Sequence, residues 1–172
     1  GRTQAIPVLE AVNLGGCEAT LNALAFGVVC SPGAALGVEG DTMGTNRIRF
    51  SHQPALPRGF RAAGVAAGIK KGGGPDLALL VSDLAAVAAA TFTTNQVRAA
   101  SVRLCEERRA AGKPARAVVI NSGCANACTG PRGRRDAVRM ALLTAKRLEV
   151  PAEAVWVCST GRIGTFLRME AV

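Results

Sequence analysis

From Gly59 onward, short apolar runs alternate with clusters of glycine, proline and polar residues, and this alternation most constrains the fold. Short apolar runs bounded by such breakers are typical of strands. The Gly-rich segment 70–76 predicts a hairpin turn between two of them, because it lacks the spacing of a phosphate-binding loop. Strands are predicted at residues 64–69, 77–82, 87–91, 116–120 and 155–158.

Two segments between these strands have the features of helices. Residues 99–111 end at Gly112, a typical helix stop. In the second segment, Asp136 is expected to be the N-cap, the apolar residues of 138–148 recur on one helical face, and Pro151 ends the element. Strands that alternate with helices predict an α/β or α+β layered domain.

Composition predicts the character of the core. Apolar residues make up 49% and charged residues 19% of the 172 residues, which is ordinary for a globular protein and unlike a disordered one. The chain is long enough for one domain or for part of a larger one. Aromatic residues reach only 3%, with no Tyr, so the core must consist mainly of Ala, Val, Leu and Ile packed closely together.

The net charge of +9 is unevenly distributed along the chain. Residues 1–42 hold one base and four acids, whereas residues 43–172 hold 20 bases and 8 acids. A basic domain can bind nucleic acid or an anionic cofactor. The alternative, which we favour, is a general arginine bias of the sequence, because aromatic stacking residues and nucleic-acid-binding motifs are missing.

The cysteines do not form a metal-binding or disulfide pattern. Cys124 and Cys128 are not spaced like a zinc knuckle, and His52, the one histidine, is distant in sequence. Buried or incidental thiols in a reducing cytoplasm are the favoured interpretation. The six cysteines are Cys17, Cys30, Cys105, Cys124, Cys128 and Cys158.

Neither a membrane span nor a secretion signal is predicted. No apolar run reaches the roughly 18 residues that a spanning helix needs. Residues 20–30 have the length of a signal-peptide apolar region, but Arg2 before them is opposed by Glu10 and Glu18. We therefore expect a cytoplasmic protein.

Two polar, Gly-rich loops follow predicted strands and are the places where chemistry is expected. Residues 121–130 follow one strand and residues 159–164 follow another. In the second loop, the Thr160 hydroxyl and the backbone N–H of Gly161 could both donate to an oxyanion on an acyl carbon. The alternative is that both loops are only turns, whose Asn and Ser side chains satisfy the backbone. Cys124 is not favoured as a nucleophile, because no histidine lies near it in sequence.

Several ordered blocks resemble the ornithine acetyltransferase (glutamate N-acetyltransferase) family, whose members include bifunctional enzymes. The resemblance covers about two-thirds of the chain, and the order of its blocks is more specific than any one of them. The matching blocks lie at residues 58–64, 68–70, 76–82, 92–100, 121–130, 133–136 and 159–169.

The resemblance implies a layered α-β-β-α sandwich and an acetyl transfer from N-acetylornithine to glutamate in arginine biosynthesis, with acetyl-CoA as a further donor in bifunctional members. It implies no cofactor. The precursor cleaves itself, and the new N-terminal Thr of the second chain becomes the nucleophile. Thr160 and Gly161 match the oxyanion-stabilising positions. The nucleophile and the C-terminal β chain of an α2β2 assembly are expected to be missing, so this chain alone should be inactive.

Some features depart from the family pattern. Arg162 stands where a small apolar residue is usual, and Arg168 where Pro is usual. Residues 1–57 have no clear counterpart, and we expect the natural start to be Met43, with residues 58–172 forming the N-terminal portion of the acetyltransferase domain. Two other functions stay open: a self-processing amide hydrolase of the same architecture, and a basic binding module without enzymatic activity.

Overall fold

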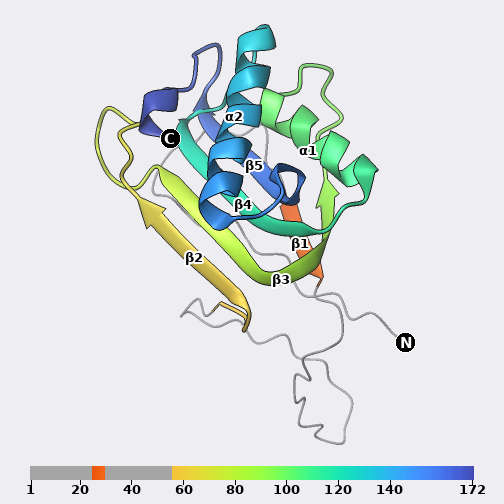
Figure 1. Cartoon of the computed structure of the whole chain (residues 1–172). Helices are drawn as coiled ribbons and strands as arrows, with labels where there is room; N and C mark the ends of the chain where they lie inside the picture. Colours follow the sequence, from red (N-terminus) through yellow and green to blue (C-terminus); the bar gives the residue numbers. More distant parts are fainter. Residues whose placement is uncertain (1–24, 30–55) are drawn as a thin grey trace, which may run out of the picture.

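The computed structural model describes residues 25–29, as backbone only, and residues 56–172 (Figure 1). The predicted start at Met43 and the rest of 1–24 and 30–55 lie outside the described residues. The strands are β1 (Ala25–Val29), β2 (Phe60–Val65), β3 (Leu77–Thr91), β4 (Ala115–Cys124) and β5 (Val155–Arg162). The helices are α1 (Ala100–Ala111) and α2 (Gly130–Leu148), with short 3-10 turns at Ala152–Ala154 and Met169–Ala171.

The strands form one mixed sheet. Its order is β1-β3-β4-β5, and β2 also pairs with β3. All pairs are antiparallel except β4 and β5, which run parallel. This arrangement follows from the chain, because α2 crosses over between β4 and β5, and a helix is the usual connection between parallel neighbours. The predicted mixed α/β class is therefore confirmed.

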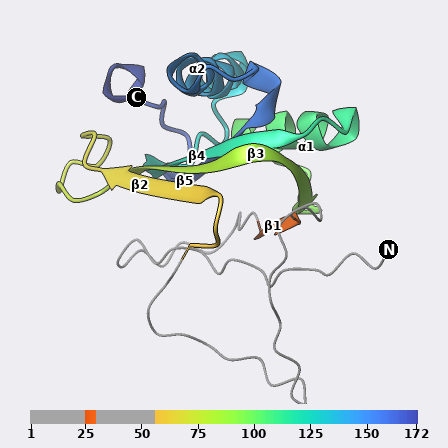
Figure 2. The same ribbon diagram turned by 60° about the horizontal axis from the view of Figure 1, so that its bottom comes forward.

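β3 is a single strand where two strands had been predicted. Its register shifts between Val81 and Ala86, and an irregularity of this kind lets a strand bend without ending. The first half pairs with β2 and β4, and the second half curls away to pair with β1 (Figure 2). The polar residues between the two apolar runs therefore mark a bend rather than a turn.

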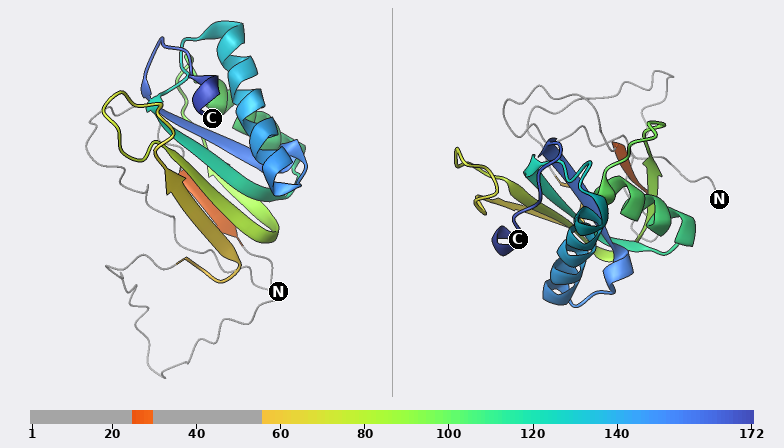
Figure 3. Two further views of the ribbon diagram at one scale, coloured as in Figure 1. Left: turned by 60° about the vertical axis from the view of Figure 1, so that its left-hand side comes forward. Right: turned by 90° about the horizontal axis from the view of Figure 1, so that it is seen from above.

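Both helices lie toward the same side of the sheet, α2 over its face and α1 beside the outer edge of β5, where Cys105 donates to the carbonyl oxygen of Val157 (Figures 2 and 3). α2 packs Met140, Ala141 and Ala145 against the alternate residues of β4 and β5 that point toward it. It begins at Gly130 with Pro131 in its first turn, so the prediction of Asp136 as N-cap is wrong. The ring of Pro131 fixes the φ angle that the first turn of a helix needs, so α2 starts at this point.

The core consists largely of small aliphatic side chains, as the composition predicted. On the face opposite α2, Trp156 is the exception, packing with Ala115 and Val118. The bent half of β3 contributes Ala88 and Ala90 to this second cluster. Within residues 56–172 and β1, neither helix combines the length and hydropathy that a bilayer crossing requires.

Candidate functional site

The two predicted loops meet at the carboxyl ends of β4 and β5. Parallel pairing continues four residues beyond each predicted strand end, so that Ser122 pairs with Thr160 and Gly123 with Gly161. Residues 121–124 and 159–162 therefore lie in strands, not in loops as predicted. The sequence could not show this, because a strand continues through polar and glycine residues only when a neighbour pairs with them.

Gly161 needs to be glycine for a reason of close packing. Its φ of +128° is a conformation that other residues rarely adopt. A Cβ there would lie 2.4 Å from the carbonyl carbon of Gly123 and 2.6 Å from the amide nitrogen of Cys124. The backbones of β4 and β5 thus touch at this pair, and the contact fixes the position of Gly161.

The backbone N–H of Gly161 is directed toward the outer edge of β5. Ala125 donates its N–H to the carbonyl oxygen of Arg162 at 2.9 Å, so that carbonyl faces β4. Val157 directs its N–H and its carbonyl toward Cys105, on the side away from β4, so the carbonyl of Thr160, three residues later, faces β4. The N–H of Gly161 is trans to that carbonyl in the same peptide and therefore points away from β4. β5 is the last strand in the described sheet order, and α1 covers its outer edge at Val157, where Cys105 bonds the backbone. Farther along β5, Thr160 is exposed. A pair of donors at an exposed strand end is what an oxyanion site requires.

The segment after β4 is held in place by its own side chains. Asn126 and Cys128 have positive φ angles, of 50° and 56°. The buried Asn126 amide donates to the carbonyl oxygen of Gly133 at 2.8 Å and accepts from the Thr129 hydroxyl at 2.7 Å. A Cβ at Gly133 would lie 1.9 Å from the Thr129 hydroxyl oxygen, so this contact needs glycine. For Asn126 and Thr129, the structural alternative fits best.

Two backbone bonds join this segment to the one after β5. Ala125 bonds Arg162 as described, and Gly164 donates its N–H to the carbonyl oxygen of Ala127 at 2.8 Å. The buried Asn121 donates from its side-chain nitrogen to the carbonyl oxygen of Cys124 at 2.8 Å. These bonds hold the segments that follow β4 and β5 against each other, so the backbone next to Thr160 and Gly161 is held in place.

Asp76 lies beside Ser122 at the same end of the sheet, and no sequence pattern predicted a role for it. Its backbone carbonyl accepts from the N–H of Ser122 at 2.8 Å, and its own N–H donates to Val65 at 2.9 Å. Its carboxylate is buried and accepts from the N–H of Ala67 and of Lys70, both at 2.7 Å. The sequence feature that could have indicated a role for Asp76 is its position as an acidic residue directly before the apolar run 77–81.

The ionisation of Asp76 reflects two opposing effects. Burial, the larger single effect, raises its pKa by disfavouring the charged form. The backbone donors of the segment 67–70 and the charge of Lys70 together outweigh burial, and the pKa is lowered below its usual value. The carboxylate is therefore ionised at neutral pH. Its hold on Ala67 and Lys70 also explains why β2 ends at Val65 and why the predicted strand 64–69 is wrong.

The described cysteines are not arranged for catalysis. Cys124 is buried and donates to the carbonyl oxygen of Thr165 at 3.3 Å. Burial raises the pKa of Cys105 to about 11 and raises that of Cys158 well above its usual value. Cys128 is exposed. Among the described residues, no group of three or more metal-binding side chains occurs.

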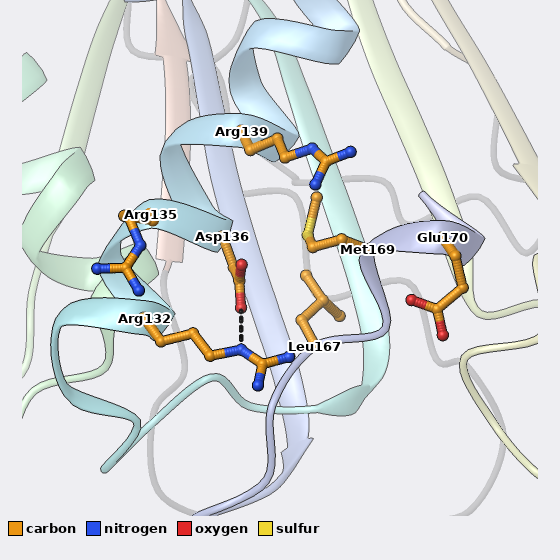
Figure 4. Close-up of a pocket in the computed structure, with 7 residues that line it drawn as sticks. All are labelled: Arg132, Arg135, Asp136, Arg139, Leu167, Met169 and Glu170. Carbon is orange, nitrogen blue, oxygen red and sulfur yellow. Dashed lines mark ion pairs between the residues drawn. The ribbon is translucent and has the colours of Figure 1, made fainter.

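A polar pocket of about 430 Å³ lies beside α2, and neither Thr160 nor Gly161 lines it (Figure 4). In this pocket, Nε of Arg132 lies 3.8 Å from Oδ2 of Asp136. The Arg132 guanidinium also lies over the ring of Phe166. Arginines and acids together line the wall of the pocket. The lining residues are Arg132, Arg135, Asp136, Arg139, Leu167, Met169 and Glu170.

The two unusual arginines have different surroundings. Arg162 is exposed at the end of β5, next to Gly161. Arg168 donates to the carbonyl oxygen of Gly68 at 3.0 Å and pairs with Glu170 at 3.3 Å. It therefore joins the segment after β5 to the loop between β2 and β3, which lies at the same end of the sheet (Figures 1 and 3).

Comparison with known proteins assigns the described domain to a family. The family described as ArgJ matches residues 61–172. The arginine biosynthesis bifunctional protein ArgJ of Prochlorococcus marinus is 54% identical over 119 residues, which is 69% of this chain and 28% of that protein. Its counterpart in Caldanaerobacter subterraneus is 56% identical over 117 residues, 68% of this chain and 28% of that protein. The chain thus spans between a quarter and a third of the length of these relatives.

Two solved structures are similar as well. The crystal structure of arginine biosynthesis bifunctional protein ArgJ from Bacillus halodurans has a TM-score of 0.64 and 40% identity, covering 66% of this chain and 59% of that one. The ornithine acetyltransferase of Mycobacterium tuberculosis complexed with ornithine has a TM-score of 0.61 and 49% identity, covering 67% of this chain and 62% of that one.

Proposed function

The chain belongs to the ArgJ family, and from this premise we propose that it is the N-terminal part of an ornithine acetyltransferase of arginine biosynthesis. The acetyl group passes from N-acetylornithine to glutamate, with acetyl-CoA as a further donor. The acyl-enzyme forms on a Thr outside residues 1–172, in a β chain that assembles with this one as α2β2 in the cytoplasm. The ornithine-bound relative supports the substrate class.

The observation that carries the proposal is the exposed edge at Thr160 and Gly161. The Gly161 N–H points outward from β5 and the Thr160 side chain is exposed beside it. When a nucleophile attacks an acetyl group, negative charge develops on the acyl oxygen. Two fixed donors that meet this oxygen stabilise the transition state more than the substrate, and this difference accelerates the reaction.

A chimaera tests the proposal, because the activity needs residues outside this chain. Residues 58–172 would replace the matching segment of the Prochlorococcus relative, and acetyl transfer from N-acetylornithine to glutamate would be measured. We expect the chimaera to transfer acetyl groups. Thr160→Ala should lower kcat by about 10²–10³, the usual effect of removing one oxyanion donor.

Thr165→Ala is the matched control. Thr165 is exposed in the segment after β5, and its hydroxyl only approaches Cys124 and Arg162, at 3.9 and 3.5 Å. Its kcat should stay within about twofold of the parent. Equal kcat in Thr160→Ala and the parent would refute the oxyanion assignment.

The other functions predict different results in the same assay. An amide hydrolase would release acetate at a rate that does not depend on glutamate, because water replaces the acceptor. A basic binding module would retain labelled DNA or RNA with affinity that falls steeply with salt. Transfer that requires glutamate, with negligible nucleic-acid binding at low salt, would exclude both.

A further inference from the structure

The buried carboxylate of Asp76 is not explained by the proposed chemistry. Asp76 directly precedes β3 and is 1% exposed. Its carboxylate therefore cannot touch an acyl group at the outer edge of β5. Its oxygens accept from two backbone N–H groups rather than from a side chain. Burial of an unpaired charge is costly, so it is retained only where its bonds are well formed.

Three contacts connect this carboxylate to Gly161. Asp76 holds the amides of Ala67 and Lys70, and thereby fixes the segment between them. That segment lies directly against Gly123: a Cβ on Gly123 would be 2.9 Å from Cγ of Lys70 and 3.4 Å from Cγ2 of Ile69. Gly123 in turn touches Gly161. Each contact involves backbone or the base of a side chain, where little adjustment is available.

Pairing across the sheet supplies a second connection. The Asp76 carbonyl accepts from Ser122, and Ser122 pairs with Thr160 in the register of β4 and β5. Asp76 is therefore connected to both proposed oxyanion donors. It is connected to Thr160 through the pairing of Ser122, and to Gly161 through the contact between Gly123 and Gly161.

We propose that Asp76 is a positioning residue, which clamps the segment 67–70 against Gly123 and so sets the place of the Gly161 amide and Thr160. This inference rests on the proposed function, because positioning matters only if these two residues stabilise an oxyanion. A displacement of about 1 Å at such a site can cost on the order of 10²-fold in rate.

The first test measures kinetics in the chimaera with Asp76→Asn. The amide nitrogen of Asn cannot accept a backbone N–H, so one of the two bonds is lost while the shape is kept. We expect kcat to fall about 10- to 100-fold with KM within twofold, since binding groups are untouched. Asp83→Asn is the control: Asp83 lies in β3, the strand that follows Asp76, is exposed, and its carboxylate pairs with the Arg61 side chain.

Unchanged kcat in Asp76→Asn would overturn the proposal, and so would an equal fall of kcat in Asp83→Asn. If Asp76→Asn does not fold, Asp76→Glu keeps the charge and shifts the oxygens by one methylene. The same loss of kcat is expected from it, and parent-like turnover would refute the clamp.

The second test does not depend on activity, and so separates this inference from the proposed function. Amide hydrogen exchange and amide chemical shifts are measured by NMR in the 172-residue chain, at a concentration below that at which it self-associates. With Asp76→Asn, exchange at Ala67 and Lys70 should speed up, and the amide signals of Gly123 and Gly161 should shift. Asp83→Asn should leave all four unchanged. If the chimaera transfers no acetyl groups but the 172-residue chain shows these shifts, the proposed function alone is refuted. Unshifted glycine signals in the 172-residue chain would refute the clamp.

Discussion

At the scale of single residues, glycine at 123 and 161 lets two parallel strands come into backbone contact at the end of the sheet. Both have positive φ, of 105° and 128°. Gly161 is a predicted site residue because glycine has no Cβ that would cover its N–H. In the structure, Gly123 lies opposite Gly161 and leaves no room for a side chain at Gly161. This restriction comes from strand pairing and not from the local sequence.

Gly161→Ala should therefore destabilise the fold by about 2–4 kcal/mol, from backbone strain and a clash with Gly123. Gly164→Ala is the matched control, because Gly164 also has positive φ, of 74°, but a Cβ there meets no atom within 4 Å. It should cost about 1 kcal/mol. Urea unfolding of the chain measures both, and equal losses would show that the contact with Gly123 is unimportant.

The ionisation of Asp76 predicts how stability changes in acid. Its pKa is lowered in the folded state, so the carboxylate stabilises the fold above the unfolded value of about 3.9, and this contribution is lost as the pH falls through the folded pKa. The urea midpoint of the parent should fall between about pH 5 and 2 more steeply than that of Asp76→Asn. Parallel curves would contradict the lowered pKa. Asp83→Asn serves as the control.

At the scale of elements, the two helices end differently. α1 ends at Gly112, as predicted, with φ of 63°. α2 ends at Glu149, which adopts φ of 54° although it is not glycine. A side chain with a Cβ pays about 1–2 kcal/mol in this conformation. Its negative charge also lies at the negative end of the helix dipole.

Glu149→Gly should thus stabilise the chain by about 1 kcal/mol, and Gly112→Ala should destabilise it by a similar amount. Glu149→Gln removes the charge and keeps the Cβ, so it isolates the dipole effect of about 0.3–1 kcal/mol. Thermal or urea unfolding of the three variants provides the comparison. If Glu149→Gln stabilises as much as Glu149→Gly, backbone strain is not the cause.

The strand boundaries were less predictable than the helices. The prediction of helix 99–111 is one residue from the observed α1, because a glycine stop is a local signal. By contrast, β3 is one strand in place of two and β5 continues to Arg162. Local sequence does not contain the pairing partner that keeps polar residues extended.

At the scale of the whole molecule, the described sheet leaves large apolar side chains in solvent. Leu84 is 78% exposed, and Val65 and Val87 are more than half exposed. β2 is exposed along nearly its whole length. The chain spans 28% of the length of the Prochlorococcus relative. We therefore infer that a segment of the complete protein outside residues 1–172 covers these exposed apolar side chains.

We therefore expect the isolated chain to bind an apolar fluorescent dye and to self-associate at moderate concentration. Adding the remaining part of the Prochlorococcus relative as a separate fragment should reduce both signals. Dye fluorescence and light scattering measure the effect, with an unrelated protein of equal size as the control. Dye binding that the fragment does not change would contradict a shared interface.

Composition, local periodicity and the order of motifs are enough to predict the class of the fold, the two helices, the aliphatic core and the family resemblance. By contrast, the pairing of β4 with β5, the contact between Gly123 and Gly161, and the outward direction of the Gly161 amide are decided by the tertiary structure. The tertiary structure also buries Asp76 beside Ser122. These features arise from residues between about 40 and 90 positions apart in the chain, whose contact is decided by strand pairing and close packing rather than by any local pattern.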